Sequence, residues 1–145
     1  MPQRELDNLV RSGLLLHEPP SREEFEGLLR SAEARLTDAT NEENSIDSRF
    51  DLAYNAAHAL ALAALRWHGY RPDRKRYIVF QVLEHTLNVE KPTWRLLGKC
   101  HDHRNQTEYG GVAPVDTRLL EGLLAAGQDL LERVRALPLP PEPGT

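Results

Sequence analysis

The sequence lacks paired cysteines, long apolar runs and a strong charge of either sign. Cys100 is its one cysteine, which excludes an intramolecular disulfide and any multi-cysteine zinc or iron–sulfur site. No apolar run approaches the roughly 20 residues that span a bilayer, and the first ten residues lack the apolar core of a signal peptide. We therefore expect a cytoplasmic protein that has no membrane partner.

The net charge of −4 gives no overall basic character, but the cations are distributed unevenly. The stretch 66–104 holds nine Lys and Arg against four Asp and Glu, a surplus of +5, which leaves −9 for the rest of the chain. Four of the six histidines also fall in this stretch. The surplus predicts a local basic cleft on an acidic body, which is compatible with an RNA partner.

Apolar residues recur at three- and four-residue steps along most of the 145 residues, which predicts an all-α fold. Ser21 and Glu24 form a capping box after Pro19-Pro20. The alanine-rich segment before Gly69 is apolar on most of its circumference, which is typical of a central helix. The expected helices span residues 4–10, 22–39, 46–68, 73–87, 92–109 and 115–137.

These helices predict one domain, residues 1–137, built as an antiparallel bundle of four to five helices. The segment Tyr77–Phe80 alone also fits a strand, but the sequence offers no evident partner strand, so we favour a helix. The proline-rich residues 138–145 are expected to form a disordered tail.

The predicted helix 92–109 is the most informative for chemistry. Arg104 lies on the same helical face as Leu97 and Cys100, with His101 beside it and Asn105 just beyond. An inward arginine is costly unless something pairs with it, so one interpretation is an anion-binding arginine in a cleft. The alternative is a surface ion pair between Arg104 and Glu108, four residues apart.

Other polar residues leave similar alternatives open. The basic turn containing Arg71, Arg74, Lys75 and Arg76, together with Lys99, either follows a nucleic-acid backbone or is simply solvated. His58, on an alanine-rich face, is interpreted as a hydrogen-bonded core residue. His101 and His103 are two residues apart, so their rings point apart on a helix, and we expect no metal and no other cofactor.

Three passages occur in a characteristic order. They are the alanine-rich segment 50–65 with Gly-Tyr-Arg-Pro at 69–72, the Leu-Glu-His-Thr-Leu run within 82–87, and Arg-Asn-Gln-Thr-Glu-Tyr at 104–109. Together they resemble the HEPN family of helical toxins and nucleotide-binding proteins over about residues 46–135. The resemblance implies a HEPN-like bundle that dimerises and brings two arginine motifs into a shared cleft.

In active members of that family, an arginine and a following histidine cleave RNA without a metal. Arg104 matches the arginine, and Asn105 matches the polar residue beside it. Tyr109 stands at the first position where the histidine is expected, and a tyrosine is a poor base at neutral pH. His101, three residues before Arg104, is either a substitute base or a histidine that packs at an interface.

The sequence therefore predicts a homodimeric HEPN-like protein that binds RNA or a nucleotide. The resemblance implies two further properties: metal-independent endoribonuclease activity of the toxin type, and a nucleotidyltransferase-like antitoxin as partner. The catalytic candidates are Arg104, Asn105, Tyr109 and His101. The alternative is a non-catalytic helical interaction module, such as an accessory or antitoxin subunit, which the replacement of the histidine favours.

Overall fold

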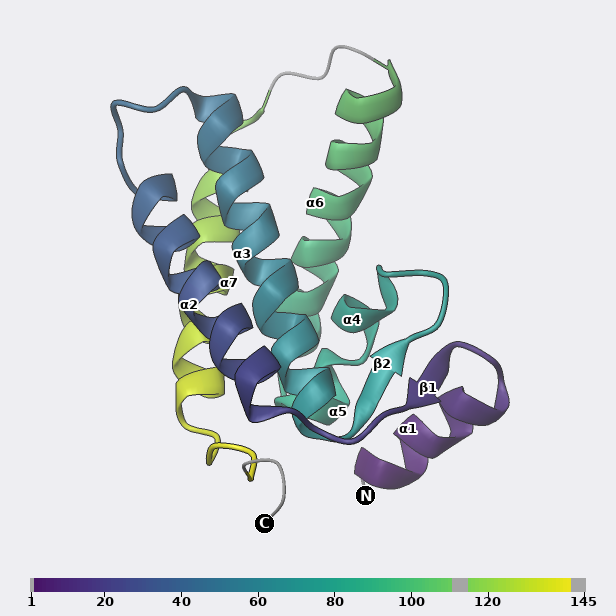
Figure 1. Ribbon diagram of the computed structural model, residues 1–145. Helices are drawn as coiled ribbons and strands as arrows, with labels where there is room; N and C mark the ends of the chain where they lie inside the picture. Colours follow the sequence, from purple (N-terminus) through teal and green to yellow (C-terminus); the bar gives the residue numbers. More distant parts are fainter. Residues whose placement is uncertain (1, 111–114, 142–145) are drawn as a thin grey trace.

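The computed structural model describes residues 2–110 and 115–141, with side chains described for 2–105 and 115–141. Four long helices stand side by side, with two running up and two running down in Figure 1. They are α2 (Arg22–Ala39), α3 (Ile46–Trp67), α6 (Lys91–Gly110) and α7 (Thr117–Arg135). The architecture is mostly helical, as predicted, and none of the described helices is long and apolar enough to cross a membrane.

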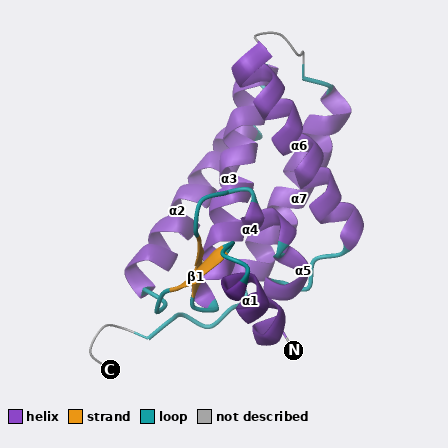
Figure 2. Cartoon of the chain, turned by 90° about the vertical axis from the view of Figure 1, so that its right-hand side faces the viewer, coloured by secondary structure: helices purple, strands orange, loops and turns teal. Residues whose placement is uncertain are grey.

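The shorter elements gather at one end of the long helices, near the N-terminus (Figure 2). They are α1 (Pro2–Arg11), β1 (Leu15–His17), β2 (Tyr70–Pro72), α4 (Ile78–Gln81) and α5 (Leu83–Thr86). The strands β1 and β2 pair antiparallel, with Leu16 opposite Arg71. The sequence does not predict these strands, because three residues are too few to show an alternating pattern.

The capping residues explain where two of the long helices begin. The Ser21 hydroxyl accepts a hydrogen bond from the backbone N–H of Glu24 at 3.2 Å, so α2 starts at Arg22 as predicted. The Ser45 hydroxyl likewise accepts from the N–H of Ser48 and starts α3. Gly69 has a φ of +91°, the left-handed conformation that commonly ends a helix, and α3 ends just before it.

The alanine-rich helix α3 is the centre of the core, as its apolar circumference predicts. It packs against both α2 and α7, and twelve of its 22 residues are buried. Alanines such as Ala57 and Ala61, both fully buried, allow these neighbours to approach closely. One edge of α3 remains open toward α4 and α6, and that edge carries polar residues.

The prediction of a single helix over residues 73–87 is wrong. Residues 73–77 form a turn, and two one-turn helices, α4 and α5, follow with a break at Val82. The apolar residues there are nearly consecutive, and a straight helix cannot turn all of them toward one core. The break lets Val79, Phe80 and Leu83 be fully buried together.

The first part of the C-terminal tail contacts the helices. The backbone oxygen of Pro138 accepts a hydrogen bond from the Trp67 indole at 2.7 Å, and that of Pro140 accepts one from Arg22 at 2.6 Å. These contacts hold residues 138–141 against α2 and α3. The rest of the predicted disordered tail, 142–145, lies outside the described residues.

Candidate functional site

A polar pocket lies between α3, α6 and the turn that precedes α4. Its volume is about 390 Å³. Every lining residue carries a polar group: Tyr54, Asn55, His58, Arg76, Tyr77, His101, Arg104 and Asn105. Two of them are arginines and none is a carboxylate, so the described lining of this pocket is positively charged.

The helical repeat explains how two elements supply six of these residues. On α3, Tyr54 and His58 are four residues apart and therefore share one edge, with Asn55 beside them. On α6, His101 and Asn105 show the same spacing, with Arg104 between them. The two edges face each other across the pocket, and the turn before α4 adds Arg76 and Tyr77.

Arg104 is anchored by α3 and not by a carboxylate. One terminal nitrogen of its guanidinium donates to Asn55 Oδ1 at 2.7 Å, and its central carbon lies 4.8 Å from the centre of the Tyr54 ring. No carboxylate of the described residues pairs with Arg104. The Glu108 side chain, its partner in the surface-pair alternative, lies outside the described residues. Neutral contacts therefore orient Arg104 and leave its charge uncompensated among the described residues.

His101 is held from three sides. Its Nδ1 is 2.9 Å from the Tyr54 hydroxyl, and its Nε2 is 3.2 Å from the Asn105 side-chain nitrogen. Its ring stacks on Tyr77, with centroids 4.2 Å apart and an angle of 17° between the planes. Both ring nitrogens thus have protein partners, so this geometry suits orientation of the pocket better than proton abstraction from a ligand.

The Tyr54 hydroxyl is protonated at neutral pH, and burial makes its ionisation still less favourable. Burial raises the pKa of Tyr54 to about 12, although the nearby Arg104 charge acts in the opposite direction. The protonated hydroxyl can then serve His101 Nδ1 as a hydrogen-bond partner in either tautomer of the ring. Tyr54 therefore links the arginine and the histidine of the pocket.

His58 faces the pocket, so its interpretation as a core residue misses a site residue. Burial, together with the nearby positive charge of Arg76, lowers the pKa of His58 to about 4. The imidazole is therefore neutral at pH 7. One sequence signal points to it: Asn55 and His58 are polar residues on the edge of an alanine-rich helix, three apart, and polar side chains in such a place need partners.

Gly98 brings Tyr77 against α6. A Cβ atom built on Gly98 would lie 2.6 Å from the Tyr77 hydroxyl oxygen, which is too close for any side chain. The tyrosine thus lies over the bare backbone of α6, where its ring meets His101. The contact between Tyr77 and Gly98 could not be predicted from the sequence, because the two residues are 21 positions apart and belong to different elements.

The structure brings together only some of the predicted site residues. Arg104, Asn105 and His101 line one pocket, and Arg76 from the basic turn joins them. Arg74 and Lys75 are exposed on the same turn. The remaining candidates lie elsewhere or are not described: Arg71 pairs with Glu18 at 2.8 Å, Lys99 lines other grooves of α6, and the Tyr109 side chain lies outside the described residues.

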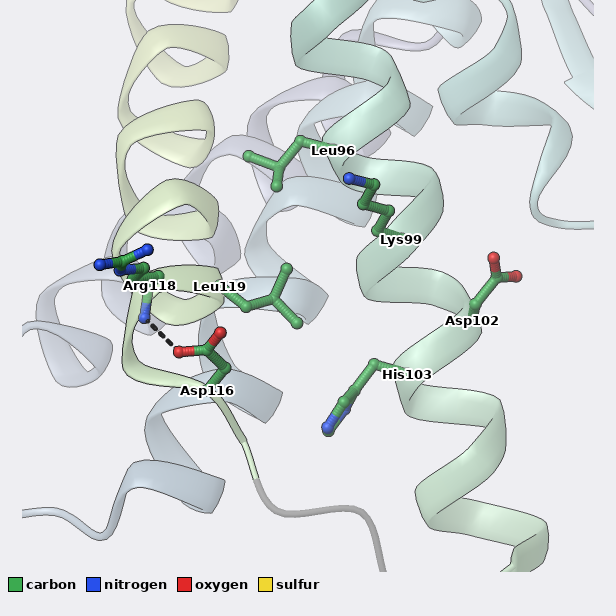
Figure 3. A pocket seen from close by; sticks show the side chains of 7 residues that line it. All are labelled: Leu96, Lys99, Asp102, His103, Asp116, Arg118 and Leu119. Carbon is green, nitrogen blue, oxygen red and sulfur yellow. Dashed lines mark hydrogen bonds between the residues drawn. The ribbon is translucent and has the colours of Figure 1, made fainter.

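A second hollow, of about 470 Å³, lies between α6 and α7 (Figure 3). Lys99 and Arg118 are balanced there by Asp102 and Asp116, and Leu96 and Leu119 supply apolar surface. Asp116 also caps α7 by accepting from the N–H of Arg118 at 3.0 Å, as the dashed line in Figure 3 marks. This balance of charge distinguishes the hollow from the arginine-lined pocket and makes it a poorer anion site.

Comparison of the chain with known protein families and with curated proteins found no match. Among the described residues, no three side chains of His, Cys, Asp or Glu are grouped as metal ligands.

Proposed function

We propose that the arginine-lined pocket binds a phosphate group of RNA or of a nucleotide. The observation that carries this proposal is the convergence of Arg76 and Arg104, from two separate elements, on one polar pocket whose described lining holds no carboxylate. A guanidinium presents a planar set of donors that matches phosphate oxygens, and a phosphate would supply the missing counter-charge.

The surroundings of the pocket favour RNA over a free anion. Arg74 and Lys75 are exposed beside Arg76, and in this proposal they contact further phosphates of the strand. Tyr77 is half-buried and offers aromatic surface next to the arginines, as single-stranded RNA sites commonly do. The resemblance of residues 46–135 to the HEPN family agrees with this choice, since that family includes RNA-cleaving members.

Cleavage of the bound RNA is a separate prediction, which depends on that resemblance. His101 has partners at both ring nitrogens, and Tyr109 occupies the position of the family's histidine. Purified protein incubated with defined RNAs in the presence of EDTA decides the matter. Cleavage that disappears in Arg104→Met supports the ribonuclease prediction. If the RNA is bound but stays intact, the protein binds RNA without cleaving it, and the ribonuclease prediction is wrong.

The predicted assembly belongs to the same proposal. A homodimer would place two arginine-lined pockets in a shared cleft, and a nucleotidyltransferase-like antitoxin would be the partner of a cytoplasmic toxin. Light scattering checks the dimer directly, because a single species of 16.5 kDa contradicts it. Should the protein bind one stoichiometric protein partner and no RNA, the interaction-module alternative replaces the RNA proposal.

The binding proposal is tested by Arg104→Met, which removes the charge and keeps the length of the side chain. We expect the affinity for a labelled single-stranded RNA, measured by fluorescence anisotropy, to fall about 10- to 100-fold, since a charged hydrogen bond to phosphate is lost. The matched control is Arg118→Met, an exposed arginine at the start of α7 in the charge-balanced hollow. Equal affinities for both variants and the wild type refute the pocket assignment.

A further inference from the structure

A larger groove adjoins the arginine-lined pocket along the first turns of α6. Its volume is about 820 Å³, and Tyr77 lines both the groove and the pocket. Figure 1 shows α4 beside this part of α6. The two hollows share the lining residue Tyr77, which precedes α4. A strand that passes over Tyr77 would therefore reach from the pocket into the groove.

The groove carries a row of cations. Lys91, Arg95 and Lys99 line it at successive four-residue steps and are all exposed, against one lining carboxylate, Asp102. Four residues advance a helix by about 6 Å, so the three charges form a track along α6 that starts beside the pocket. Such a track is suited to a polyanion that extends beyond one phosphate.

The groove also offers aromatic surface. Trp94 and Tyr77 both line it and are both half-buried. The Trp94 indole N–H is buried and has no acceptor among the described residues, which is an uncommon and costly state. An acceptor on a bound strand, lying in the plane of the indole, would give this donor the partner that it lacks.

We propose that this groove seats the nucleotide that adjoins the pocket-bound phosphate, so that the ligand is single-stranded RNA and not a mononucleotide. Its base stacks between Tyr77 and Trp94, and its phosphates follow the cations of α6. The bases of a duplex are paired and stacked internally, so a duplex cannot enter in this way. The inference rests on the proposed function, because the pocket fixes one end of the strand.

The test compares a nucleoside monophosphate, a single-stranded RNA hexanucleotide and a 12-base-pair RNA duplex on the same protein. We expect the hexanucleotide to bind most tightly. Trp94→Leu should weaken the hexanucleotide about tenfold, the effect of one lost stacking contact, and leave the monophosphate unchanged. Trp94→Phe should restore most of the affinity, and Arg104→Met should weaken both ligands.

Arg95→Gln provides a second variant that does not touch the core, since Arg95 is exposed. It should weaken the hexanucleotide and reduce the salt dependence of its binding, whatever Trp94→Leu does to folding. If Arg104→Met weakens binding while neither groove variant does, the pocket stands and the groove proposal is wrong. Equal affinity for the duplex also overturns it, and absence of all RNA binding by the wild type overturns both proposals.

Discussion

Two arginines of this protein, Arg66 and Arg104, differ in whether their contacts with described residues include carboxylates. Arg66, only 4% exposed, is surrounded by acceptors: it pairs with Glu24 and Glu18, and it donates to the backbone oxygens of Glu18, Pro19 and Tyr70. Arg104 contacts the neutral Asn55 and the face of Tyr54, and no described carboxylate pairs with it.

The difference separates a structural charge from one that is available to a ligand. The contacts of Arg66 tie the segment before α2 to the end of α3, so its charge is used inside the fold. The contacts of Arg104 orient its guanidinium while its charge still lacks a partner. An anion is the component that would complete the second arrangement.

Arg66→Met should produce the largest effect of the changes that probe this difference. It leaves several backbone oxygens without their donor, and we expect it to reduce the free energy of unfolding by about 3 kcal/mol. Arg104→Met, which loses one hydrogen bond, should cost about 1 kcal/mol. Urea denaturation of both variants measures the gap, and equal losses would remove the distinction between the two arginines.

Gly98→Ala should produce the next largest effect, and it sharpens the account of the pocket. The new methyl group would clash with the Tyr77 hydroxyl at a cost of about 1 to 3 kcal/mol, which exceeds the gain of about 0.5 to 1 kcal/mol that alanine brings in a helix, so we expect a net loss and a weaker stack of Tyr77 on His101. Gly27→Ala is the matched control, because a Cβ there meets nothing within 4 Å on a helix. That variant should gain about 0.5 to 1 kcal/mol. A neutral Gly98→Ala would show that Tyr77 moves aside at little cost and that Gly98 does not fix its position.

The effect that is smallest at neutral pH concerns His58, because its charge acts on stability only at lower pH. Its pKa falls from about 6.5 in the unfolded chain to about 4 in the pocket. Between these values the unfolded chain binds more protons, so this contribution to stability is complete above pH 6.5 and is lost as the pH falls toward 4. His58→Gln should flatten the dependence over that window, and thermal melts of both proteins measure it. An unchanged slope would mean that His58 is solvated.

The sequence predicted the four long helices well, and the reasons are local. Three signals act over only a few residues and can therefore be recognised in the sequence: capping by Ser21, the left-handed Gly69 and the apolar periodicity of α3. The pairing of β1 with β2 and the break at Val82 depend on contacts between distant segments. Those features could not be predicted from periodicity.

The sequence predicted the part of the candidate site that α6 supplies, but not the part that α3 supplies. The spacing of His101, Arg104 and Asn105 on one helix placed them together, and the structure agrees. Asn55 and His58 come from α3, about 45 residues away, and no local pattern links them to Arg104. Arg71 belongs to the same basic stretch as Arg104, but it lies outside the pocket and pairs with Glu18, the residue that follows β1.

The central claim is that the Arg76 and Arg104 pocket receives an RNA phosphate while the Arg66 cluster does not. NMR of the arginine side-chain Nε–Hε groups tests it in a single titration of the wild-type protein with a single-stranded RNA hexanucleotide. The account predicts that the signals of Arg76 and Arg104 shift progressively while that of Arg66, bonded to Glu24, stays in place. RNA binding that leaves the Arg104 signal unmoved, or that shifts Arg66 as strongly, would contradict the account.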